Sequence, residues 1–93
     1  MSYNTHICEA FCSAVNAVKR SALSAQTLDH SEYLGGDLGI DSIEMLEIWF
    51  RIEKLCDTQI PDEAKRDIYT VDEVLHVVYR YLPSIEENEV EHV

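Results

Sequence analysis

Apolar residues recur at intervals of three and four residues in three segments of this chain, at residues 5–20, 42–56 and 70–82. This is the spacing of one face of an α-helix. The repeating residues of the first segment are Ile7, Ala10, Phe11, Ala14, Val15 and Val18, and those of the last are Val71, Val74, Leu75, Val78 and Leu82. The pattern therefore predicts an all-α fold in which three main helices bury these faces against one another.

A polar stretch at residues 21–36 separates the first two helical segments. It is rich in Ser, Thr, Asp and Gly, and its apolar residues, Leu23, Leu28 and Leu34, are isolated. We therefore expect a long surface loop that is held by a few apolar contacts.

Two further helix starts follow. Pro61 fits the first position of a short third helix, because the N–H that proline lacks would have no partner there. Thr70 and Glu73 form a capping box at the start of the last helix, and Pro83 ends that helix. The predicted architecture is thus a four-helix bundle with three main helices and a short third one.

The 93 residues are enough for a single small core. We expect one domain at residues 1–83 and an acidic, disordered tail at residues 84–93. No stretch approaches the ~20 apolar residues of a membrane span, and the start of the chain shows no signal-peptide pattern. These features favour a cytoplasmic protein, and we expect a monomer.

Acidic residues dominate the charge of the chain. Against 18 Asp and Glu there are only 7 Lys and Arg, which gives a formal net charge of −11. This charge disfavours nucleic acid and anionic membrane surfaces as partners, because both would repel the protein. Protein partners guided by charge should instead present basic patches.

A serine lies at the predicted start of the second helix. Asp41 is a good N-cap residue, and Glu44, three residues later, supplies the second half of a capping box. Ser42 then takes the first helical position, where unpaired N–H groups and the helix dipole favour a negatively charged group such as a phosphodiester. Taken by themselves, Asp41 and Ser42 are also ordinary capping residues.

Residues 37–78 resemble an acyl carrier protein, whose conserved D-S-L serine bears 4'-phosphopantetheine derived from coenzyme A. The motif here reads Asp41-Ser42-Ile43, and residues 57–63 and 69–71 resemble the family's entries to its third and fourth helices. The resemblance implies a four-helix carrier that is not an enzyme, with the arm on Ser42. It also implies that Asp41 and Glu44 contact the phosphopantetheinyl transferase. Helix packing could leave an apolar crevice between the second and third helices for a short acyl chain.

The second helix has two apolar faces. Its core face is predicted to hold Met45, Ile48, Trp49, Ile52, Leu55 and Cys56. The opposite side carries Ile43, Leu46 and Phe50, with Glu47 among the charged residues at the border. Exposed apolar groups ringed by charge commonly mark a protein contact, and the family resemblance implies that this helix is recognised by acyl-loading, condensing and tailoring enzymes. Incidental exposure or packing of the loop on this side is the alternative.

The positive charges depart from the nearly unbroken acidity that fatty acid synthesis carriers show along these helices. Arg51 and Lys54 lie on the second helix, and Lys65 and Arg66 follow later. The first two either pair with Glu47 and Glu44 or face partners. If they face partners, they would oppose the basic patches of general fatty acid enzymes, which favours a dedicated pathway such as polyketide assembly.

No catalytic or metal-binding motif is evident. The sequence around Ser42 lacks the second glycine of a nucleophile elbow. Cys8 and Cys12 have the spacing of two ligands on one helix face, but no second ligand pair follows, so we expect reduced, partly buried thiols. Three alternatives remain open: an aminoacyl or peptidyl carrier, an acidic helical adaptor that never receives the arm, and a small ion-binding regulator.

Overall fold

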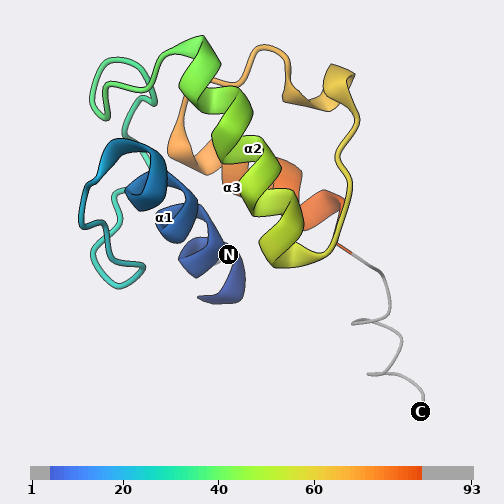
Figure 1. Cartoon of the computed structure of the whole chain (residues 1–93), viewed down its shortest axis with the longest axis horizontal. Coiled ribbons are helices and arrows are strands. Elements are labelled where there is room, and N and C mark those ends of the chain that lie inside the picture. Colours follow the sequence, from blue (N-terminus) through green and yellow to red (C-terminus); the bar gives the residue numbers. More distant parts are fainter. Residues whose placement is uncertain (1–4, 83–93) are drawn as a thin grey trace.

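The computed structural model describes residues 5–82, and all of their regular elements are helices. Along the chain these are α1 (Thr5–Lys19), α2 (Ser42–Cys56), a short 3-10 helix η1 (Asp62–Lys65) and α3 (Val71–Arg80), as Figure 1 shows. The all-α prediction is confirmed at this level. The predicted tail at residues 84–93 and the predicted stop at Pro83 lie outside the described residues.

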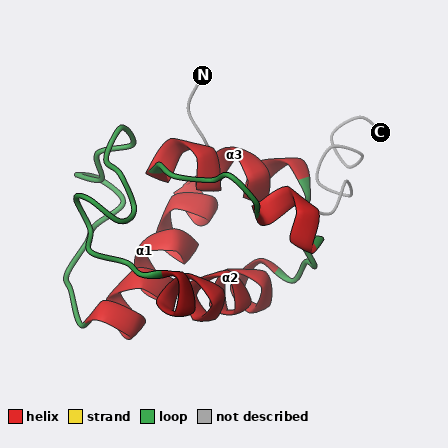
Figure 2. Ribbon diagram, turned by 90° about the horizontal axis from the view of Figure 1, so that it is seen from above, coloured by secondary structure: helices red, strands yellow, loops and turns green. Residues whose placement is uncertain are grey.

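Helix α1 is the centre of the packing, since it contacts both α2 and α3 (Figure 2). Each helix turns one apolar face inward, as its spacing predicts. The largest fully buried side chains come from all three helices: Phe11, Ile7, Ile48, Ile52, Leu75, Val15, Val71, Val74 and Val78. These residues form one continuous core.

One detail of the predicted helices is corrected. Leu55 was expected in the core but is 46% exposed, because it lies at the margin of the buried face of α2. Helix α1 ends at Lys19, within one residue of its predicted end, and the left-handed backbone of Arg20 (φ 56°) terminates it.

The loop between α1 and α2 follows its prediction. Leu34 is buried, whereas Leu23 and Leu28 are partly buried against the core. Backbone hydrogen bonds also attach this loop to the start of α3: the Leu34 N–H donates to the Tyr69 carbonyl at 2.8 Å, and the Val71 N–H donates to the Glu32 carbonyl at 3.0 Å. The loop therefore runs beside the entry to α3 and is not free in solvent.

The third helix differs from its prediction. It is a single 3-10 turn, and Pro61 stands just before its first residue as the N-cap. In contrast, the capping box of α3 is present as predicted, since the Thr70 side chain accepts from the Glu73 N–H and Glu73 accepts from the Thr70 N–H. Within residues 5–82, no helix combines the length and apolar character that a membrane crossing needs.

Candidate functional site

Ser42 is the first residue of α2, and the predicted capping box surrounds it. The Asp41 Oδ1 accepts the Glu44 N–H at 2.8 Å, and the Glu44 Oε1 accepts the Asp41 N–H at 3.0 Å. The Ser42 side chain is exposed, and no residue of the described part forms a hydrogen bond with its hydroxyl. The arrangement thus leaves a serine hydroxyl accessible at the positive end of a helix whose cap does not depend on it.

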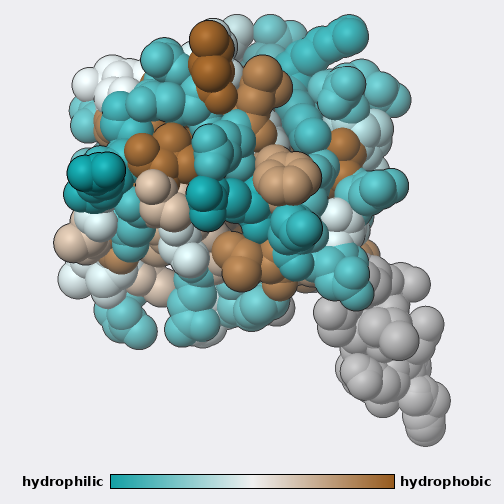
Figure 3. Space-filling view, in the orientation of Figure 1, coloured by the Kyte–Doolittle hydropathy of each residue, from teal (hydrophilic) through white to brown (hydrophobic). Residues whose placement is uncertain are grey.

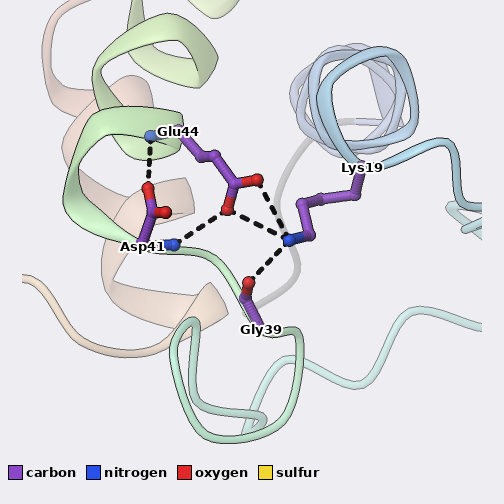
Figure 4. Close-up of polar contacts among 4 residues, drawn as sticks. All are labelled: Lys19, Gly39, Asp41 and Glu44. Carbon is purple, nitrogen blue, oxygen red and sulfur yellow. Dashed lines mark hydrogen bonds and ion pairs between the residues drawn. The ribbon is translucent and has the colours of Figure 1, made fainter.

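A lysine from the end of α1 reaches this cap. The Lys19 Nζ donates to the Gly39 carbonyl at 2.7 Å and to both oxygens of Glu44, at 3.0 and 3.1 Å (Figure 4). Figure 4 shows the Lys19 ammonium between the loop that precedes Ser42 and the first turn of α2. This contact was not predictable from the sequence, because 25 residues separate Lys19 from Glu44 and no local pattern connects them.

The backbone that leads to Ser42 is held at several points. Gly39 has φ +68°, a conformation that a glycine adopts at little cost. Ile40 is buried and its N–H donates to the Leu34 carbonyl at 2.9 Å, while the Tyr33 N–H donates to the Asp37 Oδ2 at 2.7 Å. Ser42 is therefore exposed on a segment that is itself well ordered.

Glu44 is already occupied within the protein. The backbone N–H of Asp41, and then Lys19, lower the pKa of its carboxyl below the ordinary value. Its side chain is 30% exposed. Both carboxylate oxygens of Glu44 therefore already accept hydrogen bonds from within the protein. A direct contact between Glu44 and a transferase, which the sequence led us to expect, would have to compete with these donors.

The second apolar stripe of α2 is exposed, as predicted. The exposed fractions are 76% for Ile43, 67% for Leu46 and 57% for Phe50. Figure 3 shows hydrophobic side chains interspersed with hydrophilic ones over the surface that includes α2. We call Ile43, Leu46 and Phe50 the outer stripe.

The two positive charges beside the outer stripe, Arg51 and Lys54, make different contacts. Arg51 forms an ion pair with Glu47, with 2.9 Å between the Arg51 Nη2 and the Glu47 Oε2, as expected for residues four apart. Lys54 was expected to pair with Glu44 if it did not face partners, but its ammonium lies over the ring of Phe50, 5.3 Å from the centroid. Lys54 therefore contacts the outer stripe through a cation–π interaction with Phe50.

A groove of about 780 Å³ opens beside Ser42. It lies between α2 and two connecting segments, at residues 33–36 and 62–69, and its apolar lining includes Ile40, Met45, Leu46, Trp49 and Ile68. Lys65 lines it as well; the Lys65 ammonium pairs with Glu53 at 3.0 Å and lies over the Trp49 ring, 5.8 Å from the centroid. A crevice was expected between the second and third helices; the groove lies between α2 and residues 62–69, and residues 33–36 of the long loop form a further wall.

The three cysteines, Cys8, Cys12 and Cys56, are buried, and none of them forms a disulfide bond. Burial is the main cause that raises the pKa of the Cys8 and Cys12 thiols. Residues 5–82 contain no group of three or more His, Cys, Asp or Glu side chains arranged to hold a metal ion.

No protein-family model matches the chain, and no solved structure matches it. The resemblance to acyl carrier proteins therefore rests on the sequence alone, namely on the motif at residues 41–43 and on residues 57–63 and 69–71.

Proposed function

We propose that this protein is an acyl carrier, which holds acyl intermediates as thioesters on a 4'-phosphopantetheine arm attached to Ser42. The observation that carries the proposal is the position of Ser42: an accessible hydroxyl at the start of α2, beside an apolar groove and next to an exposed apolar stripe. A carrier needs these three features together, namely a point of attachment, a shelter for the cargo and a surface for its partners.

The residues present fit the arm. The phosphodiester would be attached at the N-terminal end of α2, where the helix dipole favours negative charge. The hydroxyl needs no rearrangement to react, because it has no hydrogen-bond partner among the described residues. When attached, the arm supplies the thiol that forms the thioester.

Attachment is a substitution at phosphorus. The Ser42 Oγ forms a new P–O bond to the pantetheine-bearing phosphate of coenzyme A, and the bond from that phosphate to the nucleotide half breaks. The nucleotide half leaves with the electron pair of that bond, and the hydroxyl proton passes to a base on the transferase. This chain contributes the nucleophile and its placement.

The apolar lining of the groove suits a short acyl chain. Met45, Trp49 and Ile68 offer apolar surface to a cargo that would otherwise be in water. The outer stripe would meet the enzymes that load, extend and modify the cargo. An aminoacyl cargo would use the same arm and the same stripe, so the class of cargo remains part of the proposal.

The test is the intact mass of the purified chain before and after incubation with coenzyme A and a broad-specificity phosphopantetheinyl transferase. We expect a gain of one phosphopantetheinyl group in the natural chain and none in Ser42→Ala. A natural chain that several transferases leave unmodified would contradict the proposal.

A second candidate, an adaptor that never carries the arm, is favoured by one observation, the exposure of the outer stripe. Such a surface can dock a partner without any covalent group. An unmodified chain that still binds a partner through Leu46 and Phe50 would support the adaptor.

A further inference from the structure

The Lys19 ammonium donates hydrogen bonds to residues on both sides of Ser42 in the sequence. It donates to the Gly39 carbonyl, three residues before Ser42, and to the Glu44 carboxylate, two residues after it. Glu44 in turn accepts the Asp41 N–H. These contacts among Lys19, Gly39, Asp41 and Glu44 link the residues on either side of Ser42 in the sequence, and we call them the Lys19 clamp (Figure 4).

The ion pair of the clamp is partly shielded from solvent. The side chains of Lys19 and Glu44 are only 26% and 30% exposed, so their ion pair is less screened by water than a fully exposed one. Charged groups also form stronger hydrogen bonds than neutral ones, and three of the donor–acceptor distances here are 2.7 to 3.1 Å. The clamp joins the end of α1 to the segment that presents Ser42.

We propose that Lys19 is a positioning residue for the modification of Ser42, and that Glu44 acts through the Lys19 clamp instead of docking the transferase directly. The inference rests on the proposed function and adds to it the residue that sets the orientation of the reacting hydroxyl. Its basis is geometric: both Glu44 oxygens are occupied, and the lysine that occupies them also fixes the backbone at Gly39.

The clamp acts on the fraction of molecules that are ready to react. Without it, the burial of Ile40 and its hydrogen bond to Leu34 remain, but we expect the segment from Gly39 to Ser42 to sample more orientations, and a transferase to bind only those in which the hydroxyl is aligned. An affinity measured for such a mixture falls in proportion to the competent fraction. Loss of the clamp therefore raises the KM for the carrier and leaves kcat nearly unchanged, because a bound and aligned Ser42 reacts as before.

The experiment measures transferase kinetics with the full chain as the varied substrate. Lys19→Met should raise KM on the order of tenfold with little change in kcat, and Lys19→Arg should restore most of the natural value. Arg20→Asn is the matched control, because it removes the same charge from the adjacent position, tolerates the left-handed backbone, and alters a side chain with no hydrogen bond or ion pair among the described residues. Its KM should match that of the natural chain.

A double-mutant cycle separates positioning from direct contact. Glu44→Gln keeps an acceptor for the Asp41 N–H and loses the ion pair with Lys19. If Glu44 acts through the clamp, the variant that combines Lys19→Met and Glu44→Gln should be little worse than either alone. Amide hydrogen exchange should also quicken at residues 39–44 in Lys19→Met and stay unchanged in the core of α1 and α3.

Three outcomes overturn the inference: an Arg20→Asn effect equal to that of Lys19→Met, additive effects of Lys19→Met and Glu44→Gln, or a lower kcat at unchanged KM. Normal modification of the natural chain in the same assay would leave the proposed function intact in each case. If the natural chain is never modified, that result contradicts both the proposed function and the role of Lys19.

Discussion

Glu53 and Lys65 form an ion pair that joins α2 to η1, with 3.0 Å between the Glu53 Oε2 and the Lys65 Nζ. The same carboxylate oxygen accepts the Ile60 N–H at 2.9 Å. Glu53 thus fixes the chain between α2 and η1, and with it the wall of the groove that Lys65 lines. A second glutamate of α2, Glu47, also holds an ion pair, with Arg51, but that pair is far more exposed.

The contrast between these two glutamates gives the first prediction. Glu53→Gln should lower the free energy of unfolding by about 1–2 kcal/mol, because it removes the close charged partner of the 18%-exposed Lys65 ammonium and leaves only Asp62, 3.8 Å away, to pair with it. Glu47→Gln should change it by less than about 0.5 kcal/mol, because its pair is largely in water. Urea denaturation measures both variants, and equal losses would mean that burial of the Glu53 pair has no consequence.

The second prediction concerns the cap without the hydroxyl. Ser42→Ala should abolish attachment of the arm and leave the helicity of α2 unchanged, because Asp41 and Glu44 supply the capping box. Intact mass and far-ultraviolet circular dichroism are the two measurements. Attachment that persists in this variant would identify another hydroxyl as the acceptor.

The third prediction separates the two apolar faces of α2. Leu46→Ala or Phe50→Ala should cost less than about 1 kcal/mol, because both side chains are mostly exposed. Ile52→Ala should cost about 2–5 kcal/mol, because its side chain is 1% exposed. If the outer stripe is a docking surface, the first two variants should nevertheless slow transfer of cargo by a partner enzyme. Transfer at the natural rate in both variants would exclude that role.

The fourth prediction tests the choice of pathway. With malonyl-loaded protein and general fatty acid elongation enzymes, turnover of the natural chain should be poor, and the double variant Arg51→Ala with Lys54→Glu should improve it by removing positive charge beside the outer stripe. Because Arg51 is already paired with Glu47, we expect Lys54 to account for most of the gain. The single variants measure that division, and full activity of the natural chain would count against a dedicated pathway.

The fifth prediction follows from the two capping boxes. Backbone N–H donors are the main cause that lowers the pKa of Glu44, from Asp41, and of Glu73, from Tyr69 and Thr70. A carboxyl whose pKa is lowered by folding stabilises the fold above its unfolded value, about 4.3, and that contribution is lost as the pH falls through the folded value. Stability should therefore decline below about pH 4.5, and less steeply in Glu44→Gln and Glu73→Gln.

The same two carboxyls can be titrated directly. Their carbon chemical shifts, followed by nuclear magnetic resonance, should show midpoints below those of the urea-unfolded chain. A folded midpoint at or above the unfolded one would contradict the assigned cause.

Local signals in the sequence were sufficient for the three α-helices and for the capping boxes of α2 and α3, but not for the short third helix. The capping boxes at Asp41 and Thr70 were predictable because each depends on residues three apart, and the inward faces were predictable from helical spacing. The exposure of Leu55 was not predictable, because residues at the margin of a helix face are buried or exposed according to the neighbour that packs there.

Contacts between distant segments account for what the sequence did not reveal. The Lys19–Glu44 pair joins two elements whose approach is decided by the packing of the whole core. The groove likewise depends on the position of residues 33–36. The polar loop pattern predicted that these residues lie at the surface, but not that they pack beside α2. Ser42 and the outer stripe were identifiable because both are properties of one helix.

For the acyl carrier that we propose, the burial of all three cysteines has a chemical consequence. A thioester exchanges with a thiolate that can reach it, so an accessible cysteine on the carrier would compete with the arm for the cargo. Cys8, Cys12 and Cys56 are each at most 7% exposed, and burial keeps Cys8 and Cys12 in the unreactive thiol form. In the proposed carrier, no accessible cysteine sulfur would compete for the cargo, and a thiol-reactive label applied to the folded, arm-bearing protein would report the arm alone.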